Sequence, residues 1–283
     1  MGGGEKLERW GEIKVIRPDP QIIWPRSGDI SLWKNAHMRY TRSRSGGGRW
    51  ETLRPVPASW EISYKLNADS VEPDALKFHI RPTDFKHMGL FPEQAVNWEW
   101  AAGLIRNAGR PVRVLNLFGY TGGATVACLS AGAEVTHIDA AKGMNQWAKD
   151  NISLSNLSRV KHRVLADDAV KFIKREERRG SFYDAIIMDP PVYGRGPGGE
   201  LWKLEDRLFE LVCACAKILS KQPLFVLLNA YTAGFSPIVA ANVLQKSLSG
   251  LSLPCRVSCG EIGLRASAGG LVLPCGMYGR CEF

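Results

Sequence analysis

The sequence contains no run of about 18 consecutive apolar residues, the length that a membrane-spanning helix needs. Its first residues, MGGGEKLERWGE, also lack the apolar core of a secretory signal. These two absences favour a cytoplasmic protein without a membrane partner. With 283 residues, 45% of them hydrophobic and 23% charged, the chain has the composition of a globular protein of one or two domains.

Paired cysteine motifs are absent as well. The cysteines are odd in number and none occurs in CxxC spacing, so we expect reduced thiols rather than disulfides or a zinc site. We therefore expect no metal in this protein. The seven cysteines are Cys128, Cys213, Cys215, Cys255, Cys259, Cys275 and Cys281.

The two common phosphate-binding loops are also missing, since neither GxGxxG nor a P-loop occurs. Instead, FGYTGG at residues 118–123 follows the apolar run VRVLNL. Its glycines allow backbone angles closed to other residues and a close approach to a ligand. Asp139 ends the next apolar run, 20 residues after Gly119, where an acid can accept hydrogen bonds from a ribose diol. The pattern predicts a nucleoside-binding turn; the alternative is a glycine-rich turn that only packs.

The chain after Pro111 alternates apolar runs with helical patterns, which predicts parallel strands joined by right-handed crossovers. Two late runs, 255–264 and 269–279, have the pattern of a closing antiparallel pair. The predicted fold class is therefore α/β and doubly wound, with a mostly parallel, seven-stranded, Rossmann-like sheet. The other expected strands are 112–117, 134–138, 161–165, 183–188 and 224–228, with helices starting near Gly123, Lys142, Asp168 and Leu201.

The first part of the chain has a different composition. Seven of the nine tryptophans lie at or before Trp100, together with many prolines and short alternating runs such as WEISY and ALKFHIRP. This pattern is typical of small β-structure. We therefore expect a small N-terminal β-rich domain at residues 1–85, and a second domain at residues 86–283.

Positive charge is concentrated in that first part. The whole chain carries a net charge of +9, and residues 26–54 hold seven basic and two acidic side chains. Trp24, Trp33, Tyr40 and Trp50 are interleaved with them. Because cations bind phosphates and aromatic rings stack on bases, the mixture suits RNA or another single strand. The alternative is a solvated, loop-rich segment whose tryptophans pack on the next domain.

Two further acids follow predicted strands. Asp168, in LADDAVKFI, could accept a hydrogen bond from an adenine amino group, or it could only cap the next helix. Asp189, in YDAIIMDPPVYG, is followed by Pro190 and Pro191, which remove backbone donors and fix the chain. At the end of a central strand this predicts an acid and carbonyl groups that face the ligand cleft; the alternative is a simple turn.

Together these segments resemble the class I S-adenosylmethionine-dependent methyltransferases, over about residues 77–230. The group that they resemble most is typified by the large-subunit ribosomal RNA 5-methylcytosine methyltransferases. FKHMGLFPEQAVNW is similar to that group's Phe-Leu-Asp-Gln-Arg element, without its arginine. The resemblance implies S-adenosylmethionine as cofactor, with its ribose at Asp139 and its adenine at Asp168. The cofactor-binding set that we expect is Phe118, Gly119, Tyr120, Thr121, Gly122, Gly123, Asp139, Ala140, Asp168, Ala169 and Asp189.

One departure from that group concerns its nucleophile. Methylation at carbon 5 of cytosine requires a cysteine thiolate, which the group carries after its fifth strand or in its Asp-Pro-Pro loop. Neither PLFVLLNAYTAGF nor DPPVYGRGPGG contains cysteine, so a nitrogen or oxygen acceptor is favoured. Amino-methylating enzymes often have Asn/Asp-Pro-Pro-aromatic, but here Val192 takes the aromatic position and Tyr193 follows it. We expect catalytic roles for Asp189, Pro190, Pro191 and Tyr193, and acceptor binding by Phe91, Gln94, Arg195, Asn229 and Tyr231.

The predicted function is therefore methyl transfer from S-adenosylmethionine to RNA, with ribosomal RNA suspected. The glycine-rich residues 194–199 are interpreted as a mobile loop that can close over the substrate. Two alternatives remain open. One is a methyltransferase that acts on protein or a small molecule, and the other is a catalytically silent RNA-binding protein that kept the cofactor fold. Both a monomer and a dimer are compatible with the sequence.

Overall fold

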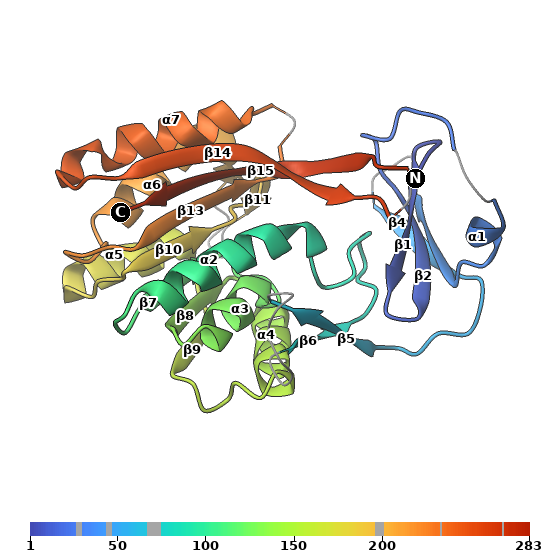
Figure 1. Ribbon diagram of the computed structural model, residues 1–283, viewed down its shortest axis with the longest axis horizontal. Helices are drawn as coiled ribbons and strands as arrows, with labels where there is room; N and C mark the ends of the chain where they lie inside the picture. Colours follow the sequence, from blue (N-terminus) through green and yellow to red (C-terminus); the bar gives the residue numbers. More distant parts are fainter. Residues whose placement is uncertain (27–29, 44–46, 67–74, 196–200, 233, 268) are drawn as a thin grey trace. The chain divides into compact units, whose positions relative to one another are not determined.

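The computed structural model describes residues 1–283 except 27–29, 44–46, 67–74, 196–200, 233 and 268 (Figure 1). The chain divides into two compact units. Unit 1 contains Met1–Tyr64, Lys77–Pro92 and Gly263–Pro274, and unit 2 contains Lys65–Leu76, Glu93–Ile262 and Cys275–Phe283. Unit 1 is thus built from three separate segments of the chain. The expected boundary between residues 85 and 86 stays a prediction.

Unit 1 is rich in strands. Its four-stranded sheet has the order β1-β2-β3-β4, in which β2 and β3 are parallel and the outer pairs are antiparallel. Ile16, Trp33 and Ala36 form a small buried cluster in this unit. Its elements are β1 (Glu5–Trp10), β2 (Ile13–Pro18), α1 (Ile30–Lys34), β3 (Met38–Arg42) and β4 (Gly48–Thr52). A separate two-stranded sheet is formed by β5 (Trp60–Lys65) and β6 (Ala75–Ile80), which belong partly to each unit.

Unit 2 contains most of a seven-stranded sheet with the order β14-β15-β13-β10-β7-β8-β9; the end of β14 and the start of β15 belong to unit 1. The five strands from β13 to β9 in that order are parallel, and β15 runs antiparallel to β13. The strands are β7 (Arg113–Leu117), β8 (Glu134–Asp139), β9 (His162–Ala166), β10 (Ala185–Met188), β13 (Phe225–Ala230), β14 (Arg256–Arg265) and β15 (Val272–Glu282). The predicted fold class, including the closing β14–β15 pair, is confirmed.

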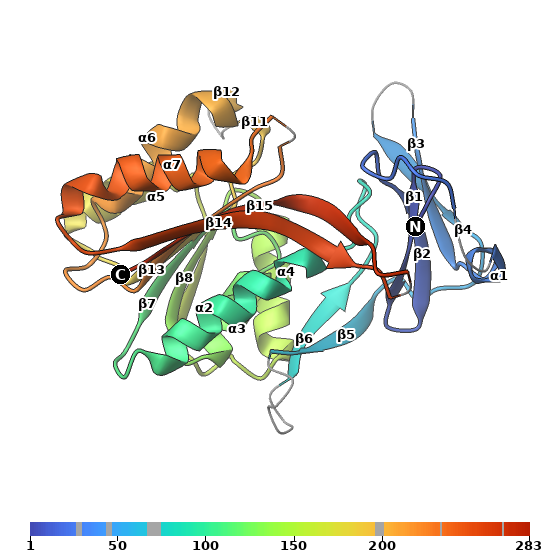
Figure 2. The same ribbon diagram turned by 45° about the horizontal axis from the view of Figure 1, so that its top comes forward.

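Helices cover both faces of this sheet (Figures 1 and 2). One face carries α2 (Ala95–Asn107), α3 (Gly123–Ser130) and α4 (Lys142–Leu154). The other carries α5 (Ala169–Arg179), α6 (Leu204–Ala216) and α7 (Pro237–Leu248). Because both faces are covered, the central strands are apolar almost throughout, and every residue of β10 and β13 is buried.

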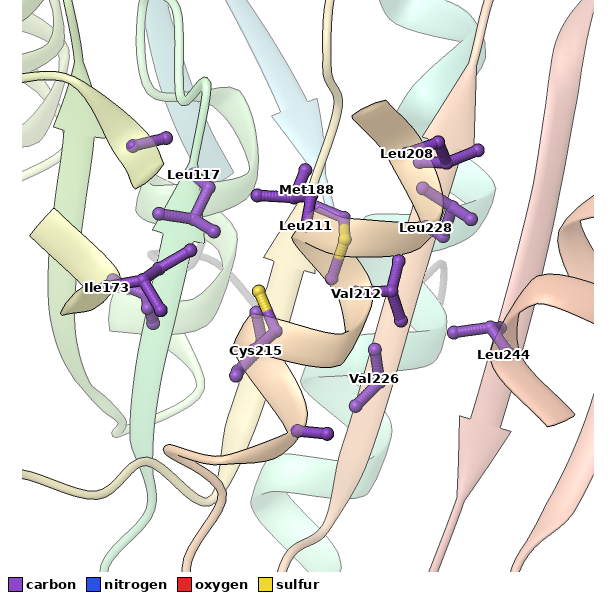
Figure 3. Packing of buried hydrophobic residues seen from close by; sticks show 14 of the residues in the cluster. Leu117, Ile173, Met188, Leu208, Leu211, Val212, Cys215, Val226, Leu228 and Leu244 are labelled. Atoms are coloured by element: carbon purple, nitrogen blue, oxygen red, sulfur yellow. The ribbon is translucent and has the colours of Figure 1, made fainter. Parts of the chain in front are cut away.

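The α5–α7 face holds an extended buried hydrophobic cluster (Figure 3). Leu117, Met188 and Leu228 come from three neighbouring strands, and Leu211 and Leu244 pack against them from α6 and α7. Apolar residues near the ends of β7, β10 and β13 are therefore anchored on one side of the sheet. This packing fixes where each strand ends, and so where the polar residues that follow it are placed.

One helix starts three residues later than the expected position near Leu201. Leu201 does not begin α6, because Leu201–Lys203 forms β12, a short strand that pairs antiparallel with β11 (Tyr193–Arg195). The helix begins at Leu204. Two short 3-10 helices, η1 (Pro92–Gln94) and η2 (Ser249–Leu251), complete the elements. No helix in the described part of the chain is both long and apolar enough to cross a membrane.

A buried network of polar side chains lies beneath the turn after β7. Asn116 Nδ2 donates to Thr125 Oγ1 at 2.9 Å, and that oxygen lies 2.8 Å from Nδ1 of the fully buried His137. Burial lowers the pKa of His137 to about 4, so the ring is neutral. A Cβ at Gly119 would lie only 2.3 Å from Cε1 of that ring. Glycine is required here because the backbone passes directly over His137.

We predict that Gly119→Ala lowers the free energy of unfolding by about 1–3 kcal/mol, because the fixed imidazole cannot withdraw from the added methyl group. Urea denaturation measures the change. Gly143→Ala in α4 is the matched control, since a Cβ there meets no atom within 4 Å. That control should raise stability by about 0.5–1 kcal/mol, as alanine does in a helix. Equal effects of the two substitutions would contradict this account of Gly119.

Candidate active site

The turn between β7 and α3 has an unusual backbone. Phe118 and Tyr120 have φ angles of 58° and 51°, a left-handed conformation that non-glycine residues rarely adopt, and Gly122 has φ of 86°. Gly119 N donates to Ile138 O at 3.0 Å, which ties the turn to the end of β8. Strained backbone of this kind is characteristic of ligand-binding loops.

The turn is only partly accessible. Phe118, Gly119, Tyr120 and Gly123 are half-buried, whereas Thr121 is fully buried. Asn151 of α4 donates to Thr121 O at 2.8 Å and holds it from behind. The accessible part of the predicted cofactor-binding turn is therefore formed by these four half-buried residues, which we call its outer edge.

Gly122 has a structural role in the turn, and its predicted contact with the cofactor stays a prediction. A Cβ there would lie 3.0 Å from the Cβ of Ala148, a tight contact that α4 could accept only by a small shift. The close approach that this glycine permits is an approach to a neighbouring helix. Together with its positive φ, this explains the glycine without reference to a cofactor.

Asp139 ends β8 and organises the loops on either side. Its Oδ2 accepts from Tyr120 N at 2.9 Å, and its Oδ1 accepts from Ala141 N at 2.8 Å. Burial raises the pKa of this carboxyl, while the two backbone donors lower it. Each carboxylate oxygen has a second lone pair available, so the group can also accept from a ribose diol. Ala140, which follows, is exposed.

Asp168 is the N-cap of α5. Its Oδ1 accepts from Lys171 N at 2.8 Å, which satisfies one of the unpaired donors at the start of the helix. The neighbouring Asp167 forms an ion pair with Arg175. Asp168 is half-buried and Ala169 is buried at the first position of the helix. The capping role is thus present, and adenine binding by Asp168 stays a prediction.

Asp189 follows β10 directly and is half-buried. Burial raises its pKa to about 7, and the nearby negative charge of Glu93 contributes. Nothing among the described residues forms a hydrogen bond or a salt bridge with its carboxylate. Pro190 is buried and Pro191 is exposed. A carboxyl of this kind, with no internal partner and a raised pKa, is characteristic of functional sites.

A polar network lies beside Asp189. Gln94 Nε2 donates to Tyr231 Oη at 2.8 Å, and Asn97 Nδ2 donates to Gln94 Oε1 at 2.8 Å and to Asn229 Oδ1 at 2.9 Å. Burial and the charges of Asp189 and Glu93 raise the pKa of Tyr231, so its phenol stays protonated. The structure thus brings four of the predicted site residues together, namely Asp189, Gln94, Asn229 and Tyr231.

Three residues of this region were not identified from the sequence. Asn97 links the network, Arg280 of β15 donates to Asn97 Oδ1, and Glu93 affects Asp189. Asn97 follows Gln94 by one helical turn, a spacing that could have indicated it. Arg280 lies 183 residues away from Asn97 in the chain, so no local pattern points to it.

Trp202 was also missed, and it connects two loops of the site. Its Nε1 donates to Pro191 O at 2.6 Å, and its ring lies 5.8 Å from the ring of Phe118. It therefore joins the Asp-Pro-Pro loop to the turn after β7. Tyr193, by contrast, is exposed at the start of β11.

The remaining expected residues have weaker structural support. Arg195 ends β11, and residues 196–200 of the expected mobile loop lie outside the described residues. Phe91 belongs to unit 1, where its ring lies 5.1 Å from that of His87. In the described part of the chain, no group of three or more His, Cys, Asp or Glu residues could hold a metal ion.

Comparison with known proteins identifies the fold. The S-adenosylmethionine-dependent methyltransferase family matches residues 51–221, which is more than half of the chain. The chain belongs to this family. It is also similar to a crystal structure of a SAM-dependent methyltransferase from Agrobacterium tumefaciens, with 39% sequence identity and a TM-score of 0.91 over 99% of this chain and 88% of that one. The cofactor of the family is S-adenosylmethionine.

Curated relatives match over shorter regions. Ribosomal RNA large subunit methyltransferase K/L of Shewanella frigidimarina is 32% identical over 51% of this chain and 20% of its own length. The protein of the same name from Chromohalobacter salexigens is 42% identical over 29% of this chain and 11% of its own length. The matched region therefore spans a fifth or less of these two relatives.

The residues at the sheet edge fit S-adenosylmethionine. Asp139 offers carboxylate lone pairs for ribose hydroxyls, and the half-buried edge of the turn at Phe118, Gly119 and Tyr120 lies next to it through the Tyr120 N–Asp139 bond. Both belong to unit 2, as does Asp189, which follows β10; in the sheet, β10 is separated from β8 only by β7. A cofactor at Asp139 and an acceptor at Asp189 would thus bind at one edge of one sheet.

We predict that Asp139→Ala raises the dissociation constant for S-adenosylmethionine at least about tenfold. A lost hydrogen bond to a charged group costs about 1.5–3 kcal/mol, and 1.4 kcal/mol corresponds to a factor of ten. Isothermal titration calorimetry measures this constant. Asp150→Ala, which removes an exposed acid from α4, is the control and should leave it unchanged. An unaltered constant for Asp139→Ala would show that the ribose binds elsewhere.

Proposed function

We propose that this methyltransferase transfers the methyl group of S-adenosylmethionine to a nitrogen or oxygen atom of RNA. The observation that carries the proposal is the Asp189 carboxylate, which accepts no hydrogen bond from any described residue and lies beside the network of Gln94, Asn97, Asn229 and Tyr231. The names of the ribosomal RNA methyltransferase relatives support RNA as the acceptor.

The chain's own residues have distinct tasks in this mechanism. When bound, S-adenosylmethionine supplies an electrophilic methyl group on a sulfonium. Asp139 binds the ribose. Ionised Asp189 accepts a hydrogen bond from the acceptor's N–H or O–H, and this bond orients the lone pair of the acceptor atom. The Asp189 carboxylate later takes up the proton. Tyr231, kept protonated, remains a neutral hydrogen-bonding group beside the acceptor.

The positions of the cysteines support a nitrogen or oxygen acceptor. Cys128, Cys215 and Cys281 are buried, and burial raises the pKa of each thiol. Cys275 influences the phenol of Tyr231 electrostatically. However, Cys275 shares its strand face with the buried Met277, whereas Tyr278, opposite Asn229, lies on the other face. These four cysteines are therefore poorly suited to provide a thiolate nucleophile beside Asp189.

Unit 1 supports RNA binding through its cations rather than its rings. Arg42 and Arg49 are exposed, and neither forms a salt bridge with a described residue. By contrast, Tyr40 is only 3% exposed, and its ring lies 5.2 Å from that of Trp50. Trp33 is buried, with Arg26 stacked 4.0 Å over its ring. These three aromatic side chains pack inside their own unit and offer little surface to a base.

We predict that the rate of methyl transfer rises with pH through about 7, because the raised pKa leaves Asp189 protonated below that pH. Glu93→Gln removes a negative charge from its surroundings, so the midpoint should move to lower pH. Burial, the larger cause, remains, so the midpoint should stay above the ordinary value for aspartate. Initial rates between pH 5 and 9 test this. A profile that is flat, or the same in both proteins, would contradict the role of Asp189.

A second prediction concerns RNA affinity. Of the basic residues considered above, Arg39 is paired with Glu5 at 3.0 Å, and Arg44 lies outside the described residues. The double variant Arg42→Ala/Arg49→Ala should weaken RNA binding and reduce the slope of log affinity against log salt by about 0.7–0.9 per lost phosphate contact. Fluorescence anisotropy at several salt concentrations measures both. Arg39→Ala is the control, for which we expect a smaller effect. Unchanged RNA binding by the double variant would show that Arg42 and Arg49 do not contact the RNA phosphates.

A third prediction separates the acceptor atoms. RNA that contains 5-fluorocytidine traps enzymes that attack the ring with cysteine, because fluorine cannot leave as the proton does. We expect no covalent adduct with this protein on a denaturing gel. An adduct that disappears in Cys275→Ser would instead identify a cysteine-dependent 5-methylcytosine enzyme.

A further inference from the structure

Arg280 fixes the orientation of one amide in the polar network. Its Nε and one terminal nitrogen lie 3.1 Å and 2.6 Å from Asn97 Oδ1, and the same terminal nitrogen donates to Val96 O at 3.1 Å. A guanidinium group has only donors. The oxygen of the Asn97 amide must therefore face Arg280, and its nitrogen must face the other way, toward Gln94 and Asn229.

That orientation is passed to the next two amides. Asn97 Nδ2 donates to Asn229 Oδ1 and to Gln94 Oε1, so the side-chain oxygens of Asn229 and Gln94 both face Asn97. Gln94 is then left with its nitrogen toward Tyr231, to which it donates. Asn229 is left with its nitrogen on the end opposite Asn97. The orientation of each amide group thus follows from Arg280, whose guanidinium can only donate hydrogen bonds.

The amide nitrogen of Asn229 lies on the same sheet face as Asp189. Met188 and Leu228 are partners in the parallel β10–β13 register, so Asp189 and Asn229 are neighbours on one face. Within the described residues, no group accepts a hydrogen bond from Asn229 Nδ2. A carboxylate acceptor and an amide donor, neither hydrogen-bonded to another described residue, are therefore adjacent at the end of these two strands.

We propose that Arg280 is a positioning residue that acts through Asn97 to make Asn229 present its N–H, rather than its oxygen, beside the Asp189 carboxylate. This donor–acceptor pair fits an edge that carries an N–H next to a lone-pair acceptor, as nucleobases do. It disfavours an edge with two acceptors or two donors, because one buried group would lose its partner. The assignment of this site to the methyl acceptor rests on the function proposed above.

The structure holds Arg280 firmly. Its guanidinium lies 4.6 Å from the ring centroid of Trp100 and 4.3 Å from that of Tyr278, and such cation–π contacts add to its hydrogen bonds. Trp100 also donates to Glu282 at 3.0 Å and packs on Phe225 of β13. Trp100→Phe therefore weakens the packing around Arg280 without touching Asn97, and it provides a matched control for effects on stability alone.

Two substitutions at Arg280 separate polarity from packing. Lysine keeps the charge and has only donors, whereas glutamine has both a donor and an acceptor and allows the Asn97 amide to turn over. The probe is an in vitro transcribed large-subunit ribosomal RNA with tritium-labelled S-adenosylmethionine. We expect Arg280→Gln to lower kcat at least about tenfold, the equivalent of one lost charge-assisted hydrogen bond. Arg280→Lys and Trp100→Phe should retain most of kcat, and all three should bind the cofactor as the unchanged protein does.

A readout independent of activity accompanies the kinetics. In ¹⁵N-labelled protein, the side-chain amides of Asn97 and Asn229 should each give one pair of signals in the unchanged protein and in Arg280→Lys. In Arg280→Gln these signals should shift or split as the amides turn over. Wild-type signals in Arg280→Gln, or a loss of rate shared equally by Trp100→Phe, would overturn the proposal. If the unchanged protein does not methylate the RNA, the proposed acceptor fails, while the amide signals still decide the role of Arg280.

Discussion

The site depends on the parallel pairing of β7 with β8 on one side and β10 on the other. This pairing brings the carboxyl ends of three strands, at Leu117, Ile138 and Met188, to one edge of the sheet. The turn that follows β7 is then tied to β8 by the bonds from Gly119 to Ile138 and from Tyr120 to Asp139. Without this register, the acid proposed for the ribose and the acid proposed for the acceptor would not share an edge.

The two acids lie in different electrostatic surroundings. Asp139 accepts two backbone hydrogen bonds, which favour its ionised form and oppose the effect of burial. Asp189 has no such donors among the described residues and has Glu93 nearby, so its pKa rises to about 7. The backbone donors at Asp139 thus suit it to hydrogen bonding as a carboxylate, whereas Asp189 is suited to taking up and releasing a proton near neutral pH.

Much of the fold could be predicted from local patterns, because strands covered on both faces are apolar throughout, and β10 and β13 are examples. The same applies to Asp139 and Asp189, which end such strands. Helix α2 was not predicted, although its buried residues Asn97, Ala101 and Ile105 recur at a helical period. The Arg280–Asn97 contact could not be predicted, since it depends on the pairing of β15 beside β13. The packing of Gly122 against Ala148 could not be predicted either, because a sequence does not show which neighbour an added side chain would meet.

We propose above all that the polar site at the ends of β10 and β13 receives an RNA nitrogen or oxygen as the methyl acceptor. The most direct measurement uses S-adenosylmethionine with an isotope-labelled methyl group and an unmodified large-subunit ribosomal RNA transcript. The RNA is then digested to nucleosides, which are analysed by mass spectrometry. The account predicts label on a base nitrogen or a ribose or base oxygen. Label in 5-methylcytidine, or label only in protein or small molecules, would contradict it.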